Sequence, residues 1–275
     1  MRRSGAPDGE TRRRIALLLE YDGTAYSGSQ YQENGPSIQS ELEAAINNLT
    51  AERVRPAFAG RTDAGVHALG QVAAFDTASR LEPAEFVRGL NHFLPEDIAV
   101  IDAAPVAEAF DPRRDARNRL YRYRILNRPA RSPLARNRAW HVPGPLDVAA
   151  MAQAGRVLEG THDFAAYAGP YEGPTMRTLR RCEVTASGEH VVIEVEAQAF
   201  LPHQVRRMAG PLADVGLGRA DAATLRRWLE EAKPSSAGPA APAHGLYLVR
   251  VEYAGPVFGQ RAREPRETAG EWTMR

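Results

Sequence analysis

The chain of 275 residues contains little cysteine, little lysine and no long apolar run, and each shortage excludes a class of protein or site. Its single cysteine, Cys182, rules out an internal disulfide and any metal site built from cysteines. Because no run of about 18 apolar residues exists, no membrane span is expected. The charged N-terminus is not followed by the apolar core of a signal peptide, which predicts a cytoplasmic protein.

The shortage of lysine is matched by an excess of arginine. Lys233 is the only lysine among 35 basic residues, and 34 acidic residues reduce the net charge to +1. Ten arginines and a single acid, Asp115, occupy residues 113–138, which we call the arginine-rich segment. Guanidinium groups fit phosphates, and the tyrosines within this segment offer faces for unstacked bases. The segment therefore predicts contact with a polyanion, although a solvated surface is the simpler interpretation for most single arginines.

Hydrophobic periodicity divides the chain into two halves with the same order of elements. Residues 13–104 are expected to run strand, helix, strand, strand, helix, strand, and residues 105–254 repeat this order with one extra helix. This is the order of the ferredoxin-like split βαβ unit, whose antiparallel sheet has helices on one face. We therefore predict an α+β fold with two joined sheets facing a common cleft. Residues 1–12 and 255–275 are expected to be polar tails.

The expected elements can be placed by residue. Strands are predicted at residues 13–21, 53–59, 70–76, 98–103 and 118–127, in a hairpin around Ser187-Gly188, and at 245–253. Helices are predicted after Ser37, from Pro83, after Asp147, and over residues 203–216 and 221–232. A long loop is predicted over residues 160–178.

The most specific short segment is GRTDAGVHA, residues 60–68, which joins two predicted strands. Two glycines around Asp63 indicate a tight loop that holds one carboxylate at a fixed angle. On composition alone, a turn or capping aspartate is the simpler interpretation. No Lys-Ser or Lys-Thr follows, so phosphate-loop spacing is absent, and Gly216-x-Gly218 lacks the third glycine of a dinucleotide site.

Seven further segments accompany this loop in order along the chain: EYDGTAYSG, SIQSELEAAI, NHFLPEDIAV, YRYRI, DFAAY, AFLPHQVRRMAG and GLYLVRVEY. Together with GRTDAGVHA they resemble the bacterial tRNA pseudouridine synthases of the TruA type over roughly residues 14–254. The resemblance implies an isomerase that converts uridine to pseudouridine at positions 38, 39 and 40 of the tRNA anticodon stem-loop. It also implies two ferredoxin-like halves around an RNA-binding cleft, and a homodimer.

The implied reaction is an intramolecular transfer. It breaks the N-glycosidic bond, turns the uracil and rejoins it to the ribose through C5. Because no redox change or net hydrolysis occurs, the reaction needs no cofactor and no metal. The seven histidines of the chain agree with this, since they show no metal-ligand pairing such as HExxH.

The resemblance assigns the main roles residue by residue. Asp63 matches the catalytic aspartate, and Arg206 matches the arginine whose positive charge keeps that carboxylate ionised. The carboxylate could attack C1′ or C6, or abstract the C2′ proton. Tyr121 matches the tyrosine that stacks on the uracil, and its hydroxyl could transfer a proton. Without the resemblance, Arg206 would be a solvated helix arginine and Tyr121 a core tyrosine.

Three residues match substrate-binding positions of that family. Arg61 matches an arginine near the extruded nucleotide, and Gly245 and Leu246 match a strand that lines the uracil pocket. A turn arginine and a buried core strand explain these residues nearly as well. Tyr123 shares a strand face with Tyr121 and is the weaker candidate of the two.

The chain departs from that family's pattern at three places. Ser29 stands where tryptophan is usual, Asp111-Pro112 stand where His-Ala is frequent, and Pro202-His203 replace a more typical pair. None of these changes removes a proposed catalytic residue. They leave the choice of tRNA and of uridine open.

Two other functions remain open from the residues. One is an RNA-binding protein or tRNA chaperone with little catalysis, and the other is a carboxylate-dependent hydrolase of a small nucleoside. The presence of Asp63, Tyr121 and Arg206 favours the synthase over a chaperone. Ten arginines in one segment exceed what a small substrate needs, which argues against the hydrolase.

Overall fold

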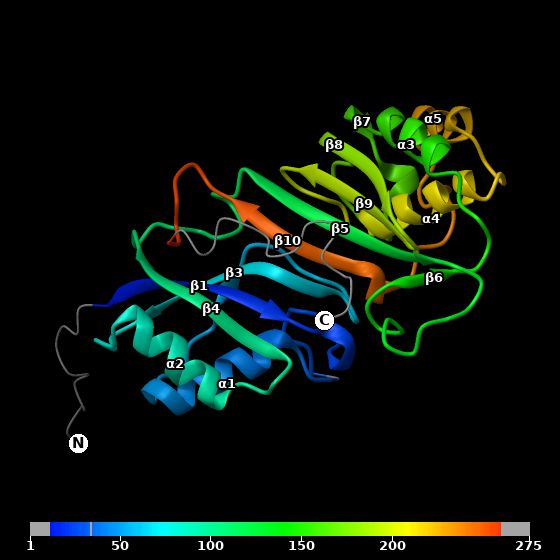
Figure 1. Ribbon diagram of the computed structural model, residues 1–275. Coiled ribbons are helices and arrows are strands. Elements are labelled where there is room, and N and C mark those ends of the chain that lie inside the picture. The colour runs from blue at the N-terminus through cyan, green and yellow to red at the C-terminus, as the bar shows by residue number, and fades with distance from the viewer. Residues whose placement is uncertain (1–11, 34, 260–275) are drawn as a thin grey trace, which may run out of the picture.

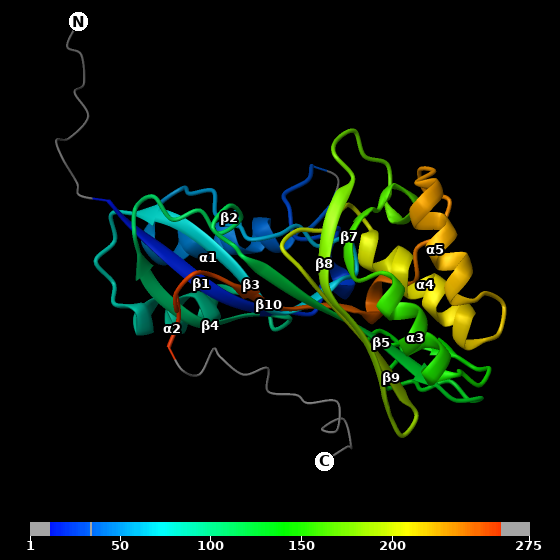
Figure 2. The ribbon, with the colours of Figure 1, turned by 90° about the horizontal axis from the view of Figure 1, so that it is seen from above.

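The strands form one continuous sheet. The computed structural model describes residues 12–33 and 35–259, so most of both predicted tails, residues 1–12 and 255–275, lies outside the described residues. Within them, ten strands pair in the order β4-β1-β3-β10-β5-β9-β8-β7, with β2 added to β3 and β6 to β5 (Figure 1). The five α-helices of the described residues pack in two groups, one at each end of this sheet (Figure 2).

The elements have the following bounds. The strands are β1 Arg13–Tyr21, β2 Ala57–Phe58, β3 His67–Thr77, β4 Ile98–Val106, β5 Asn118–Asn127, β6 Trp140–Val142, β7 Gly160–Asp163, β8 Met176–Ser187, β9 His190–Ala197 and β10 Leu246–Glu252. The α-helices are α1 Ile38–Thr50, α2 Pro83–Phe93, α3 Val148–Val157, α4 Gln204–Gly216 and α5 Ala222–Glu231. Short 3₁₀ helices are η1 Gly23–Ala25, η2 Ala165–Tyr167 and η3 Ala243–Gly245.

The helices begin where local capping chemistry predicts. The Ser37 side chain accepts a hydrogen bond from the Ser40 backbone at the start of α1, and the Asp147 side chain caps α3 through Ala150. Pro83 is the first residue of α2, where its missing N–H costs nothing. The predicted order strand, helix, strand, strand, helix, strand is therefore confirmed for the first half.

The two predicted sheets are joined edge to edge as one continuous sheet, and β10 makes the junction. β10 pairs antiparallel with β5, with Leu246 opposite Tyr123, and parallel with β3, with Tyr247 opposite His67. The strand expected over residues 53–59 forms only as the two-residue β2, which pairs with β3 near Ala74 alone. The rest of this edge of β3 is therefore available to β10. The free edge of β3 is thereby closed by a strand from the other half.

Two short strands, β6 and β7, were not predicted from the sequence. The segment of residues 160–178, expected to be a loop, contains β7, η2 and the start of β8, and β6 was not expected at all. β6 has three residues and β7 has four, which is too few for a period-2 pattern to emerge. Both form because the backbone groups of β5 and β8 need partners.

A single large hydrophobic cluster joins the two groups of helices through the sheet. It includes Leu17 of β1, Phe86 of α2, Ile193 of β9 and Met208 of α4, all fully buried. Side chains on the opposite face, such as Leu120, form separate small clusters. No helix among the described residues has the length and apolar character needed to cross a membrane.

Three histidines link folding stability to pH. Burial lowers the pKa of His67, His190 and His244 below the ordinary value of 6.5. The unfolded chain therefore binds protons that the folded chain does not, so stability rises with pH through this range. We expect the thermal unfolding midpoint, followed by circular dichroism, to fall by a few degrees between about pH 7.5 and pH 5.5.

The variant His190→Gln should flatten part of this dependence, since it removes one of the three titrations. A midpoint that stays constant, or that rises as the pH is lowered, would contradict the assignment.

Candidate active site

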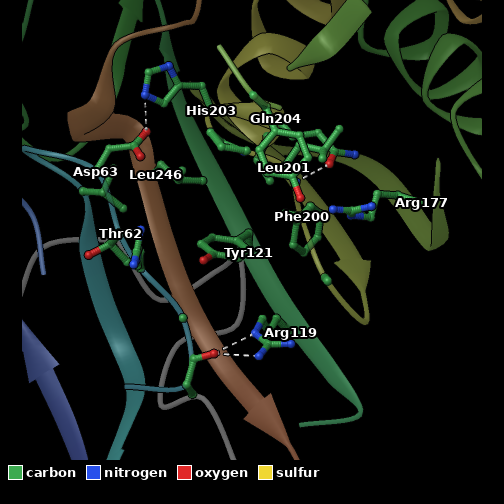
Figure 3. Close-up of a pocket in the computed structure, with 18 of the residues that line it drawn as sticks. Thr62, Asp63, Arg119, Tyr121, Arg177, Phe200, Leu201, His203, Gln204 and Leu246 are labelled. Carbon is green, nitrogen blue, oxygen red and sulfur yellow. Dashed lines mark hydrogen bonds and ion pairs between the residues drawn. The ribbon is translucent and has the colours of Figure 1, made fainter. Parts of the chain in front are cut away.

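A cavity of about 430 Å³ lies between the loop that carries Asp63, strand β5 and the segment joining β9 to α4 (Figure 3). Figure 3 shows Thr62 and Asp63 on one side, Tyr121 in the middle, and Phe200, Leu201 and Gln204 on the other side. The residues that line it are Ala59, Gly60, Arg61, Thr62, Asp63, Val66, Arg113, Arg119, Tyr121, Tyr171, Arg177, Ala199, Phe200, Leu201, Pro202, His203, Gln204, Val205 and Leu246.

Neighbouring segments hold the Asp63 loop through Thr62. The Ser29 backbone N–H donates to the Thr62 carbonyl at 3.0 Å, and the Thr62 N–H donates to the Ser29 Oγ at 2.8 Å. The Thr62 hydroxyl is 2.8 Å from the Tyr21 hydroxyl. Ser29 stands at one of the positions where the chain departs from the resembled family's pattern. It is buried, and its hydrogen bonds anchor Thr62, the residue directly before Asp63.

Two glycines make this close approach possible. Gly65 ends the turn after Asp63 with φ +77°, a backbone conformation that L side chains rarely adopt. Gly28 has φ +108°, and a Cβ on it would lie 2.8 Å from the Thr62 carbonyl oxygen. Of the two glycines predicted to mark a tight loop around Asp63, Gly65 has a positive φ and Gly60 does not.

The carboxylate of Asp63 is paired with Arg206 of α4. The Arg206 Nη1 donates to the Asp63 Oδ2 at 2.9 Å, and its Nε donates to the Ala241 carbonyl at 2.8 Å. The side chains of Asp63 and Arg206 are 30% and 17% exposed, so the pair is only partly screened by water. The structure thus brings together two residues that lie 143 positions apart.

His203 also lies beside Asp63, and the sequence did not predict this contact. Its Nε2 lies 3.7 Å from the Asp63 Oδ2 (Figure 3). His203 precedes α4 in the left-handed conformation, with φ 59°, which turns its side chain back toward the Asp63 loop. The tertiary structure sets this turn, so the sequence could not show that His203 faces Asp63. The only signal in the sequence was that His203 lies close to Arg206 along the chain.

Tyr121 lines the cavity from the middle of β5. It is 7% exposed, and its ring meets the Phe200 ring edge-on with centroids 5.1 Å apart. Burial raises the pKa of its hydroxyl well above the ordinary value, so the hydroxyl stays protonated at neutral pH. It can therefore donate a proton or a hydrogen bond to a ligand in the cavity.

The remaining sequence candidates lie in different surroundings. Arg61 is exposed and Leu246 is buried, and both line the cavity. Gly245 is not among the described lining residues and packs against Tyr123, where a Cβ would lie 2.7 Å from the ring. Tyr123 itself is fully buried and donates to the Pro242 carbonyl at 2.7 Å, so it belongs to the core.

The arginine-rich segment is not uniformly exposed. Arg122 pairs with Glu194 at 2.8 Å, and the Arg124 guanidinium lies 4.3 Å from the centre of the Tyr247 ring. Both side chains are buried, as is Arg119. The expectation that the segment as a whole offers phosphate contacts is therefore too broad, since strand β5 directs these three arginines into the protein.

Arg119 connects three segments around the cavity. It donates to the Ala59 carbonyl from Nε at 3.2 Å and from Nη2 at 2.6 Å. It also donates to the Arg113 carbonyl at 2.8 Å and to the Gln198 carbonyl. The start of the Asp63 loop, the segment before β5 and the segment after β9 are thus joined by one guanidinium. These contacts predict that Arg119 positions the three segments.

We expect Arg119→Lys to lower the turnover number by about 10²-fold while the affinity for substrate changes little, because a small displacement of a catalytic group is costly. Lysine keeps the charge but cannot reach three carbonyls at once. The matched control is Arg114→Lys on the exposed segment before β5, which should keep wild-type kinetics. A weaker affinity with an unchanged turnover number would assign Arg119 to substrate binding instead.

The described residues contain no group of three or more histidine, cysteine, aspartate or glutamate side chains that could hold a metal ion. The cavity presents the carboxylate of Asp63, which is paired with Arg206, and the protonated phenol of Tyr121. Groups of this kind at one cavity are typical of an enzyme active site.

Comparisons with known proteins agree with this class. The family described as tRNA pseudouridine synthase matches residues 17–113 and 154–254. The chain is 49% identical to tRNA pseudouridine synthase A of Myxococcus xanthus, over 93% of this chain and 96% of the relative. It is 46% identical to that of Pelobacter propionicus, over 88% and 100%, and 50% identical to that of Roseiflexus castenholzii, over 88% and 91%.

The chain belongs to the tRNA pseudouridine synthase family. The resemblance identified from its motifs is therefore confirmed, and the protein is an isomerase.

Proposed function

We propose that this protein isomerises uridine to pseudouridine at positions 38, 39 and 40 in the anticodon stem-loop of tRNA, with Asp63 as the catalytic carboxylate. The family match and relatives named tRNA pseudouridine synthase A support the substrate and the reaction. The observation that carries the catalytic assignment is the 2.9 Å pair between Asp63 and Arg206, at the cavity that Asp63 and Tyr121 line.

Asp63 acts on the nucleotide as an ionised group. Arg206 stabilises the carboxylate by charge and by a hydrogen bond to one oxygen, which leaves the other oxygen available to the substrate. The carboxylate attacks C1′ or C6, or removes the C2′ proton, and each route leads to release of N1 and bonding of C1′ to C5. C5 then loses one proton and N1 gains one, so the product is an isomer of the substrate.

Tyr121 holds the uracil in the cavity and donates a hydrogen bond or a proton. Its buried, protonated hydroxyl and its place among the lining residues support this role. Leu246 contributes an apolar wall for the base. Arg61, exposed at the same cavity, contacts the nucleotide backbone or fills the gap that an extruded base leaves. Gly245 acts indirectly, because it lets Tyr123 pack behind Leu246.

The same family resemblance supports two ferredoxin-like halves, residues 13–104 and 105–254, around a central RNA-binding cleft. The strand order β10-β5-β9-β8 with helices α3 to α5 agrees with this view for the second half. The resemblance also supports a homodimer and a cytoplasmic location.

The test is pseudouridine mapping of an unmodified tRNA transcript after incubation with the protein, without added metal or nucleotide. New pseudouridine at positions 38, 39 or 40 is the expected result. Pseudouridine elsewhere would correct the site of action. No product across several transcripts that the protein still binds would instead favour an RNA-binding protein without catalysis.

A further inference from the structure

A second cavity, of about 540 Å³, lies in the part of the arginine-rich segment that the active site does not use. Figure 1 shows this part as the loop that leads into β6. The cavity is lined by Leu126, Arg131, Ser132, Pro133, Ala135, Arg136, Ala139, Trp140, His141 and His244. We propose that it binds one nucleotide of the RNA substrate outside the target uridine, with its phosphate on Arg131 and Arg136 and its base against Trp140. The proposal rests on the proposed function for the identity of the RNA.

The cavity is strongly biased toward an anion. Arg131 and Arg136 are both exposed, and no hydrogen bond or ion pair from another described residue reaches either guanidinium. Aspartate and glutamate are absent from the described residues that line it. Two exposed guanidinium groups with no acid beside them in this lining fit the oxygens of a phosphate.

The walls fit a base. Trp140 is half-buried, and its ring meets the Tyr123 ring edge-on, with centroids 6.2 Å apart. Leu126, Ala135 and Ala139 form a buried apolar cluster of their own beneath the cavity. Unstacked bases of RNA bind on aromatic faces over apolar surfaces of this kind.

Hydrogen bonds within the loop between β5 and β6 hold the cavity in this shape without a ligand. The Arg128 side chain donates to the Ala130 and Arg131 carbonyls, at 2.8 Å and 3.3 Å, and His141 Nε2 lies 2.8 Å from the Arg128 carbonyl. Farther along, the Tyr247 hydroxyl donates to the Arg138 carbonyl at 2.8 Å. A preorganised loop loses little conformational freedom on binding.

The position of the cavity suits a strand of RNA that also enters the active site. His244 lines the second cavity and Leu246, two residues later, lines the first. Both cavities therefore adjoin the same short segment, η3 and the start of β10. One polynucleotide can occupy both, with its target base in the first cavity.

A second copy of the chain is the competing occupant, because Leu134 in the same loop is 77% exposed. Charge argues against it. A twofold interface with its axis at this cavity would bring Arg131 and Arg136 of one copy against the same residues of the other, with no acid among the described lining residues to offset them. A polyanion meets the same surface with complementary charge.

The test compares tRNA binding and kinetics of wild type with those of the double variant Arg131→Ala, Arg136→Ala. We expect the dissociation constant and KM for tRNA to rise about tenfold at moderate salt, with the turnover number at saturating tRNA unchanged. The slope of log K against log salt concentration should decrease by about 0.7–0.9 for each phosphate that the variant no longer neutralises. The matched control, Arg226→Ala with Arg227→Ala on the exposed side of α5, removes the same charge and should leave all three quantities unchanged.

Substitutions of Trp140 test the base contact separately. Trp140→Phe should keep wild-type affinity, whereas Trp140→Leu should weaken binding without changing the salt slope, since it removes a stacking face and no charge. Thermal unfolding of each variant identifies any that fails to fold.

Unchanged affinity in the arginine variant would overturn the proposal. So would a change of its mass from dimer to monomer in light scattering, which would assign the surface to contact between copies. Because binding is measured directly, failure of wild type to form pseudouridine would refute the proposed function and still leave the binding comparison decisive for this cavity.

Discussion

Asp63→Asn should lower pseudouridine formation by at least about 10³-fold, since Asp63 is the one acidic side chain among the described residues that line the cavity. Asparagine has the same shape, and its side-chain oxygen can still accept the hydrogen bond from Arg206. The loop keeps its other contacts, because these run through Thr62 and Gly65 rather than through the carboxylate. We therefore expect the thermal unfolding midpoint of the variant to match that of wild type.

The measurement is single-turnover conversion of an unmodified tRNA transcript, with tRNA binding measured in parallel. Binding should be unchanged or tighter, because a negative charge that faces a polyanion is removed. The control is Asp214→Asn, at the far end of α4, which should keep full activity. Substantial turnover by Asp63→Asn would show that a neutral side chain suffices and would exclude Asp63 as a nucleophile or base.

Arg206→Met should lower the rate by about 10²-fold, because it removes a preorganised cationic donor from the reacting carboxylate. Methionine fills much of the same volume, so the change tests charge more than packing. His203 Nε2, 3.7 Å from the Asp63 Oδ2, remains beside the carboxylate in this variant.

Arg206→Lys separates the two contacts of this side chain. Lysine can pair with Asp63 but cannot also donate to the Ala241 carbonyl in the geometry of a guanidinium, so an intermediate rate is expected. Single-turnover rates for the three proteins should fall in the order arginine, lysine, methionine. Equal rates for wild type and methionine would remove Arg206 from the mechanism and leave it a role in anchoring α4.

The elements that could be predicted are those whose signals are local. Ser37 and Pro83 mark helix starts because a side-chain cap and a missing N–H act within one turn. The tight loop around Asp63 could also be predicted from the sequence, because Gly65 can adopt a positive φ that other residues avoid. The proposed roles of Asp63, Tyr121 and Arg206 came from the motifs they share with a family. The structure places Asp63 and Tyr121 at one cavity, with Arg206 paired to the carboxylate.

The features that could not be predicted depend on which distant segments meet. The insertion of β10 between β3 and β5 is decided by backbone groups of β3 that β2 leaves free, and no pattern within β10 encodes this choice. Arg119 illustrates the same limit at the site. Its place in an arginine-rich run indicates a surface that contacts phosphates, yet three carbonyls from separate segments accept its hydrogen bonds.

The sequence by itself determined the helices, the longer strands, the loop that presents one carboxylate and the family to which the chain belongs. These follow from periodicity, caps, turn residues and motifs, which act over short stretches of chain. Only the tertiary structure decided that the sheet is continuous, that His203 turns toward Asp63, and which arginines are buried and which line a second cavity. Those outcomes depend on long-range pairing and burial, where each group must find its partner elsewhere in the chain.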